Sequence, residues 1–259
     1  AATTSNTVGG NQIGYADNGG TIVALGNPSD GVRLEGSGGG NRVIGAAFAY
    51  NVNGIYLNDS GASAIQNSAV YSSVEHGIVL SGALTTQNII DGGILDGNGL
   101  DGLSEKSYLL GNFWRPDRMN GNGGLGIDRI APNDALNQPT VAISGLMTTI
   151  TDYDRQAGVV TGTGALVPVS TIFGTLYPRV DIYGVASADR DPSGYGEGSA
   201  YLYFTTITDP GGGWTFQMTE GERRVFPCVT AIASMAIFGS SEFSLTLCRS
   251  TVFVPAVVR

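Results

Sequence analysis

Gly31-Val32-Arg33-Leu34 recurs as Gly54-Ile55-Tyr56-Leu57 and again as Gly77-Ile78-Val79-Leu80. The pattern continues in weaker form at Gly102-Leu103 and Gly126-Ile127, so successive glycines lie 23, 23, 25 and 24 residues apart. Self-similarity at a fixed period of about 20–50 residues is typical of a solenoid. The first half of the chain is therefore predicted to consist of stacked coils.

Each repeat predicts short strands rather than a helix. It contains two or three stretches of alternating apolar residues, separated by Gly, Asn, Asp and Ser. Alternation indicates β-strands, and no stretch has the length or the period of an amphipathic helix. A leucine-rich repeat has a similar period, but its Leu-x-x-Leu-x-Leu pattern is absent. We predict a parallel β-helix of about five coils, in which Val32/Leu34, Ile55/Leu57 and Ile78/Leu80 stack inward as ladders.

The composition changes near Asp128. Residues 1–128 hold 14 of the 16 Asn and 26 of the 40 Gly, but only 2 of the 10 Pro. The following stretch is rich in Pro and Asn, which favour turns. The predicted domains are therefore a parallel β-helix over 1–128, a connector over 129–139 and a second domain over 140–259.

The second domain is predicted to be an antiparallel β-sandwich. Alternating stretches such as Arg179-Val180-Asp181-Ile182-Tyr183 and Trp214-Thr215-Phe216-Gln217-Met218 are separated by turn signals such as Asp209-Pro210-Gly211-Gly212-Gly213. Regularly spaced short strands of this kind are typical of a sandwich. The domain ends in a hydrophobic tail, residues 251–259. The whole chain is thus expected to be all-β.

Charge and hydropathy exclude two classes of partner. The formal net charge is −9, with 13 Lys and Arg scattered along 259 residues, which argues against nucleic acid. No apolar stretch approaches the roughly 20 residues that cross a bilayer, so no membrane span is expected.

Both cysteines fall in the predicted sandwich. If their strands form a hairpin, pairing Cys228 with Cys248 also pairs Val229 with Leu247, Ala231 with Leu245 and Ala233 with Phe243, which places apolar residues together on one face. We expect a disulfide, which would suit an oxidising compartment. Two unpaired thiols on neighbouring strands are the alternative. A metal site at the cysteines is not expected, because no Cys-x-x-Cys is present and the only histidine lies in the other domain.

Several motifs in order resemble bacterial secreted right-handed parallel β-helix repeat proteins with a C-terminal Ig-like β-sandwich. The motifs are the Asn/Gly-rich coils, Asn122-Gly123-Gly124-Leu125-Gly126-Ile127-Asp128, Pro192-Ser193-Gly194-Tyr195-Gly196-Glu197-Gly198, Gly213-Trp214-Thr215-Phe216 and Ser241-Glu242-Phe243-Ser244. The likeness covers most of the chain but breaks at the irregular fourth coil, residues 104–119. It implies a right-handed coil, an Ig-like second domain and an extracellular or cell-surface location, and most proteins of this kind have no known activity.

Parallel β-helices also carry polysaccharide lyases and hydrolases, and hydrolases need converging carboxylates. The candidates are Asp91, Asp96 and Asp101, which lie within one coil and the turn after it. Carboxylates at such corners usually bond their own backbone and close turns. His76 stands at the position of Asn53 and Asp101 in other coils, which predicts a stacked corner residue rather than a base. A carbohydrate-active enzyme or a module that binds surface glycans is thus the alternative function.

Asp189, Asp191 and Glu197 place three carboxylates within nine residues of the second domain. Carboxylate oxygens are the ligands that Ca²⁺ prefers, so this loop is a candidate calcium site. Acidic loops commonly hold no ion, and no other cofactor is expected.

The ends of the β-helix carry the main functional prediction. A solenoid exposes its core at each end and needs caps. The sandwich can cap one end, but coil-like sequence that includes Ile13 begins close to the N-terminus without an amphipathic cap. We predict head-to-tail self-assembly, in which the open coil of one copy stacks on the next copy or receives a strand from it.

The predicted assembly residues are Ile13 and, in the tail, Val252, Phe253, Val254, Val257 and Val258. The alternative is that a preceding segment supplies the cap and that the tail is the last sandwich strand. The expected function is a non-enzymatic, extracellular structural protein.

Overall fold

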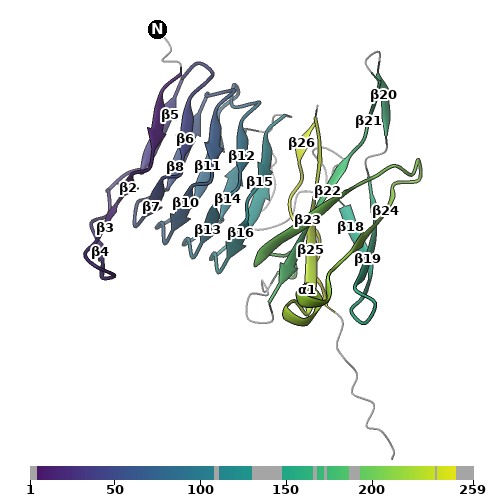
Figure 1. Ribbon diagram of the computed structural model, residues 1–259. Helices are drawn as coiled ribbons and strands as arrows, with labels where there is room; N and C mark the ends of the chain where they lie inside the picture. Colours follow the sequence, from purple (N-terminus) through teal and green to yellow (C-terminus); the bar gives the residue numbers. More distant parts are fainter. Residues whose placement is uncertain are drawn as a thin grey trace, which may run out of the picture.

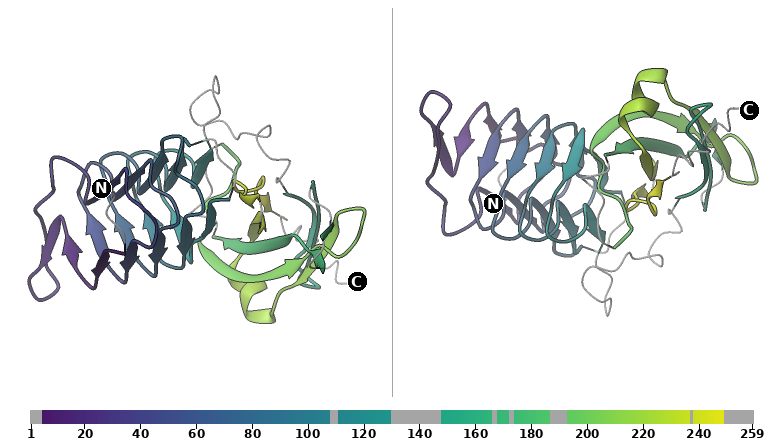
Figure 2. Two further views of the ribbon diagram at one scale, coloured as in Figure 1. Left: turned by 90° about the horizontal axis from the view of Figure 1, so that it is seen from above. Right: turned by 90° about the horizontal axis from the view of Figure 1, so that it is seen from below.

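The computed structural model describes residues 5–107, 111–129, 148–165, 168–171, 174–186, 193–236 and 238–248. Its N-terminal part is a β-solenoid with three parallel sheets of five strands, and its C-terminal part is built from antiparallel sheets (Figure 1). The all-β prediction and the parallel β-helix are confirmed. In views from above and below, the coils stack side by side and the C-terminal sheets lie against the last of them (Figure 2).

Each coil contributes one strand to each parallel sheet. The first sheet contains β1 (Thr7–Gly9), β6 (Arg42–Ile44), β9 (Ala64–Gln66), β12 (Ile89–Asp91) and β15 (Phe113–Arg115). The second contains β2 (Gln12–Ile13), β7 (Ala47–Ala49), β10 (Ala69–Tyr71), β13 (Ile94–Asp96) and β16 (Arg118–Asn120). The third contains β5 (Val32–Glu35), β8 (Ile55–Asn58), β11 (Ile78–Ser81), β14 (Leu103–Glu105) and β17 (Ile127–Arg129). A hairpin of β3 (Tyr15–Asp17) and β4 (Ile22–Ala24) is inserted in the first coil.

The recurring tetrapeptides form the third sheet in the predicted register. Val32 pairs with Ile55, which pairs with Ile78, and Leu57 pairs with Leu80. Ile55, Leu57, Ile78 and Leu80 are at most 1% exposed, so the inward ladders are confirmed. The glycine before each strand recurs because neighbouring coils approach closely there. A Cβ atom on Gly77 would lie 2.4 Å from the carbonyl oxygen of Gly102.

The C-terminal part is a sandwich of two antiparallel sheets over a shared apolar core. One sheet contains β18 (Thr148–Asp154), β19 (Val159–Gly164) and β24 (Gly213–Gln217). The other contains β23 (Ala200–Thr206), β22 (Arg179–Val185), β25 (Cys228–Met235), β26 (Gly239–Ser240) and β27 (Leu247–Cys248). Buried residues of both sheets, among them Tyr153, Trp214, Ile182 and Val229, share one cluster. A small hairpin of β20 (Val169–Thr171) and β21 (Gly174–Leu176) and the helix α1 (Glu220–Val225) complete the described part.

The predicted disulfide is confirmed between Cys228 and Cys248, and Val229 pairs with Leu247 as predicted. The rest of the predicted hairpin is wrong. The Ser244 N–H donates to the Ala231 carbonyl, and the Ser241 N–H donates to the Ala233 carbonyl. The two serine hydroxyls in turn accept from the N–H groups of Ala231 and Ala233. Side-chain oxygens thus replace ladder partners, which interrupts the regular alternation.

Candidate functional site: the junction of solenoid and sandwich

The sandwich closes the last coil of the solenoid with an aromatic side chain. Phe243 is 2% exposed and belongs to the solenoid core cluster together with Tyr183. Its ring meets the Tyr183 ring edge-on at 5.1 Å. A Cβ atom on Gly126, in the last coil, would lie 3.0 Å from Phe243 Cε2, so a larger residue there would force the ring to shift. The interruption of the hairpin therefore places Phe243 at the end of the solenoid.

Glu197 ends a ladder of asparagine side chains that runs along one corner of the solenoid. Asn98 donates from its backbone N (3.1 Å) and its Nδ2 (2.8 Å) to Oδ1 of Asn122, one coil further on. Asn122 repeats this pattern, donating from its backbone N (3.0 Å) and its Nδ2 (2.7 Å) to Oε1 of Glu197. The second oxygen of Glu197 accepts from the backbone N of Gly121 at 2.6 Å. A sandwich side chain thus occupies the place of the next coil's asparagine.

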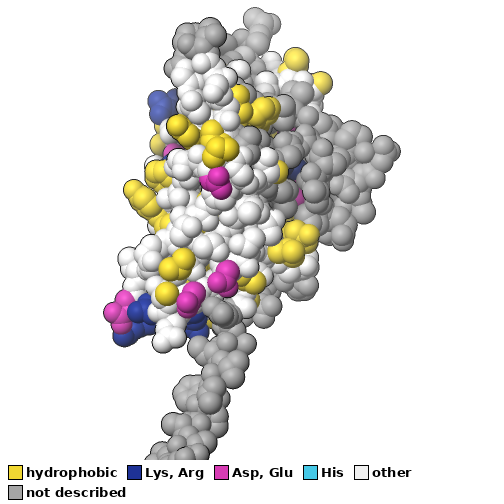
Figure 3. Space-filling model, turned by 90° about the vertical axis from the view of Figure 1, so that its right-hand side faces the viewer, with side chains coloured by type: hydrophobic (Ala, Val, Ile, Leu, Met, Phe, Trp, Pro, Cys, Tyr) yellow, Lys and Arg dark blue, Asp and Glu magenta, His cyan; other side chains and the backbone are white. Residues whose placement is uncertain are grey.

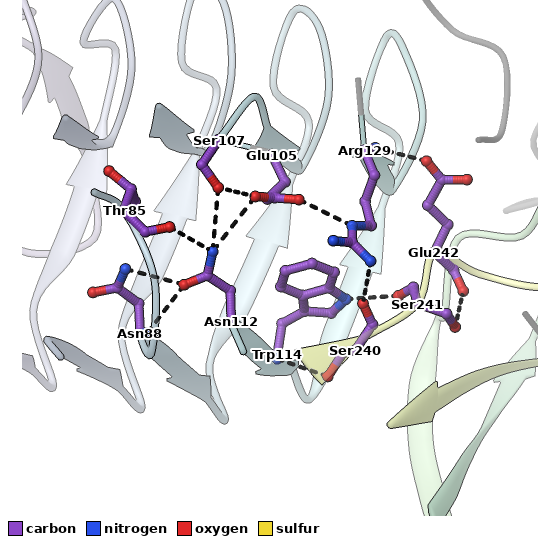
Figure 4. Close-up of polar contacts among 10 residues, drawn as sticks. All are labelled: Thr85, Asn88, Glu105, Ser107, Asn112, Trp114, Arg129, Ser240, Ser241 and Glu242. Carbon is purple, nitrogen blue, oxygen red and sulfur yellow. Dashed lines mark hydrogen bonds and ion pairs between the residues drawn. The ribbon is translucent and has the colours of Figure 1, made fainter. Parts of the chain in front are cut away.

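A charged pair replaces leucine in the last two coils. In the third sheet, Leu80 pairs with Glu105, and Glu105 pairs with Arg129. Arg129 Nε lies 2.9 Å from Glu105 Oε2, and the two side chains are 4% and 0% exposed. The guanidinium also lies over the Trp114 ring at 5.4 Å (Figure 4).

The sandwich completes the polar environment of this pair. The Arg129 backbone N donates to Glu242 Oε1 at 2.6 Å, and its Nη1 donates to the Ser240 carbonyl at 3.3 Å. Trp114 Nε1 donates to the Ser241 carbonyl at 2.7 Å. On the solenoid side, Glu105 accepts from Ser107 in a chain that continues to Asn112 (Figure 4). Buried charges are tolerated only when they are paired and hydrogen-bonded in this way.

The three candidate hydrolase carboxylates lie at three different places on the solenoid, two of them on different sheets and one before a strand. Asp91, on β12, pairs with Arg115, and Asp96, on β13, pairs with Arg118. Asp101 lies before β14, pairs with His76 Nδ1 at 3.0 Å and accepts from the backbone N of Leu125 at 2.9 Å. The structure does not bring the trio to one point, and each member has its own partner.

His76 lies in a corner stack, as its position in the repeat predicts. Its backbone N donates to Asn53 Oδ1 at 3.1 Å, and its ring lies against Asp101. Lys106 Nζ is 3.5 Å from its Nε2. His76 is 6% exposed.

Of the calcium candidates, only Glu197 lies within the described residues, and Asp189 and Asp191 lie outside them. In the part of the chain that is described, no group of three or more His, Cys, Asp or Glu could hold a metal ion. Of the assembly candidates, Ile13 is half-buried on β2 in the first coil. Val252, Phe253, Val254, Val257 and Val258 lie outside the described residues.

A groove runs along the junction between the first parallel sheet and the sandwich. Two adjoining hollows of about 240 and 300 Å³ share Asp91 and Arg115 from the solenoid and Arg179 from the sandwich. Asp181 lines the first hollow, and burial raises the pKa of its carboxyl while Arg179 opposes the rise. Burial also raises the pKa of Tyr201, which lines the second hollow. The sequence did not indicate this groove, because its walls come from both domains.

In comparisons with known proteins, no protein-family model and no curated protein matches this chain. Among the described residues, no helix is long and apolar enough to cross a membrane.

Substituting Glu197 tests its role as the last member of the asparagine ladder. We expect Glu197→Ala to cost about 2–4 kcal/mol of unfolding free energy, because three donors lose a charged acceptor. Glu197→Gln should cost less than half as much as Glu197→Ala, since glutamine presents an amide oxygen to Asn122 as the asparagines of earlier coils do. Urea unfolding measures both values. If Gln costs as much as Ala, Glu197 does not act as a ladder member. If chelation of Ca²⁺ lowers the wild-type Tm as much as the Ala substitution does, a calcium role is supported instead.

Proposed function

We propose that the chain is a non-enzymatic, extracellular structural protein that assembles head to tail into a filament or array. The observation that carries the proposal is the open edge of the first coil. Among the described residues, β1, β2 and β5 each pair on one side only, with β6, β7 and β8. Three neighbouring strand edges therefore offer backbone donors and acceptors to another chain.

Apolar surface accompanies these open edges. Ile13, Val32 and Leu34 are only half-buried, whereas the matching residues of later coils are fully buried. On and beside the hairpin of the first coil, Ile22 is 50% exposed and Leu25 is 63% exposed. A second chain that paired with the edges would also cover this surface.

The closed C-terminal end of the solenoid favours one form of assembly. Because Phe243 and Glu197 cover the last coil, another copy cannot stack its first coil directly there. On the described part of the sandwich face in Figure 3, hydrophobic side chains are scattered and do not form one docking patch. We therefore favour the form in which the open edge receives a strand from the next copy. The predicted donor, residues 251–259, lies outside the described residues.

Two observations support an extracellular location. The disulfide between Cys228 and Cys248 is the kind of cross-link that persists in oxidising compartments. The order of motifs in this chain resembles that of secreted bacterial proteins with a parallel β-helix and an Ig-like sandwich. In many of those proteins, a turn like the sequence at residues 122–128 closes the helix.

The edge proposal is tested by removing donors from the open side. The N–H groups of Arg42 and Ala47 bond to the carbonyls of Asn6 and Asn11. Since the backbone of a strand alternates, the N–H groups of Thr7 and Gln12 point away from the solenoid. We expect Thr7→Pro with Gln12→Pro to reduce polymers at least tenfold in sedimentation velocity, because proline cannot donate.

The matched control is Thr7→Val with Gln12→Val, which keeps both N–H groups and should assemble like the wild type. A chain that ends at residue 250 should also remain monomeric if the tail is the donor. Polymers that survive the tail deletion would overturn the strand-donor form, and polymers that survive the proline pair would overturn the edge proposal. Closed dimers in place of polymers would overturn head-to-tail assembly.

A glycan-binding module on the solenoid flank is the second candidate, and the junction groove favours it. The groove contains Asp91 but neither Asp96 nor Asp101. It therefore supports binding rather than the hydrolase or lyase form of that candidate.

A further inference from the structure

The junction groove combines charged and aromatic side chains from two domains. Asp91, Arg115 and Phe113 line it from β12 and β15, and Arg179 and Asp181 line it from β22. Tyr201, Tyr203 and Phe204 of β23 line the adjoining hollow. Together the hollows reach the range of roughly 300–1,000 Å³ that is typical of small-ligand sites.

Both arginines are held in place, and each leaves one donor group unused. Arg115 donates from Nε (2.8 Å) and Nη2 to Oδ1 of Asp91. Arg179 donates from Nε (2.8 Å) and Nη2 (2.6 Å) to Oδ1 of Asp181, and Nη2 also reaches the Tyr201 hydroxyl at 2.8 Å. Within the described residues, neither Nη1 group nor Asp91 Oδ2 has a protein partner. The groove thus offers fixed donors beside a fixed acceptor.

Aromatic rings hold the guanidinium planes and provide an apolar platform. The Arg179 guanidinium lies 3.9 Å from the centre of the Phe204 ring, and the Arg115 guanidinium lies 5.8 Å from that of Tyr201. Tyr203 stacks on Phe204 at 4.9 Å and is 58% exposed. An exposed ring beside paired donors and acceptors can contact the apolar face of a sugar while the polar groups bind its hydroxyls.

We infer that the groove binds a neutral oligosaccharide across the two domains, with Arg115, Arg179 and Asp91 binding hydroxyls and Tyr203 stacking on a sugar ring. The charge of the site selects this class. Two arginines are balanced by Asp91 and Asp181, with Asp117 at the rim, so no net positive charge is left for a polyanion. The net charge of −9 on the whole chain also repels acidic glycans. The inference deepens the second candidate function and is independent of self-assembly.

Calorimetric titration of the full chain tests the inference. The probes are neutral oligosaccharides of three to six residues made of glucose, xylose or N-acetylglucosamine, with oligogalacturonate as the acidic comparison. We expect saturable binding of at least one neutral probe and weaker binding of oligogalacturonate. Tyr203→Ala should weaken binding by roughly three- to tenfold, because the variant loses the aromatic ring on which the sugar stacks.

The matched control is Tyr177→Ala, since Tyr177 is 51% exposed and lies outside the groove lining, and it should leave affinity within about twofold. Arg115→Gln should weaken binding by a similar factor to Tyr203→Ala, and circular dichroism will verify that both variants fold. If both groove variants bind a neutral oligosaccharide as tightly as the wild type does, the groove is not the binding site, although the glycan-binding function would stand. No binding of any neutral probe would overturn both, and tighter binding of oligogalacturonate would overturn the ligand class. Sedimentation of the same samples reports assembly separately.

Discussion

Phe243→Ala is expected to cost about 3–5 kcal/mol of unfolding free energy, the range for truncating a buried phenylalanine. The ring is 2% exposed and contacts the last coil at Gly126 and the sandwich at Tyr183. The cavity would therefore open the end of the solenoid and loosen both domains together. Urea unfolding followed by tryptophan fluorescence reports on both the solenoid and the sandwich, because the two tryptophans of the chain, Trp114 and Trp214, lie in different core clusters.

Leu245 provides the control for that substitution. It follows Phe243 by two residues in the same segment but is 52% exposed, so Leu245→Ala should change stability by less than about 0.5 kcal/mol. Equal effects of the two substitutions would mean that the segment, rather than the cap formed by Phe243, determines stability.

Separating Glu105 from Arg129 is the second large effect. We expect Arg129→Leu or Glu105→Leu to cost about 3–5 kcal/mol, because each leaves a buried charge without its partner. The double variant should recover more than half of that loss, since it extends the inward column of Leu34, Leu57 and Leu80 through the last two coils. Thermal unfolding should show a fall of roughly 10 °C in Tm for each single variant.

The partly exposed pair of Arg118 and Asp96 is the control. Their side chains are 44% and 15% exposed, and Arg118→Leu should cost less than about 1 kcal/mol. A double variant that is as unstable as the sum of the singles would show that Glu105 and Arg129 act independently, and would contradict a role as a coupled pair.

The solenoid was predictable because its rules are local. A glycine that must sit under the next coil, followed by two inward apolar residues, repeats at a nearly constant period, and the register follows from alignment of the repeats. The replacement of Leu80 by Glu105 and Arg129 in the same column is also visible in that alignment. The repeats alone did not reveal the partner that allows charge at that place.

The junction was not predictable for the same reason. Glu197 stands in an acidic loop, which in sequence resembles a calcium site, and only the fold brings it to Asn122. Phe243 fits a regular hairpin, and only the bonds from Ser241 and Ser244 show that the segment leaves the ladder. The groove joins residues 91 and 179, which no local pattern relates.

Negative-stain electron microscopy of the full chain at increasing concentration is the direct test of head-to-tail assembly. Head-to-tail assembly should give polar fibres whose length grows with concentration and whose axial repeat corresponds to one solenoid with its sandwich. Single particles of monomer size at every concentration would contradict it.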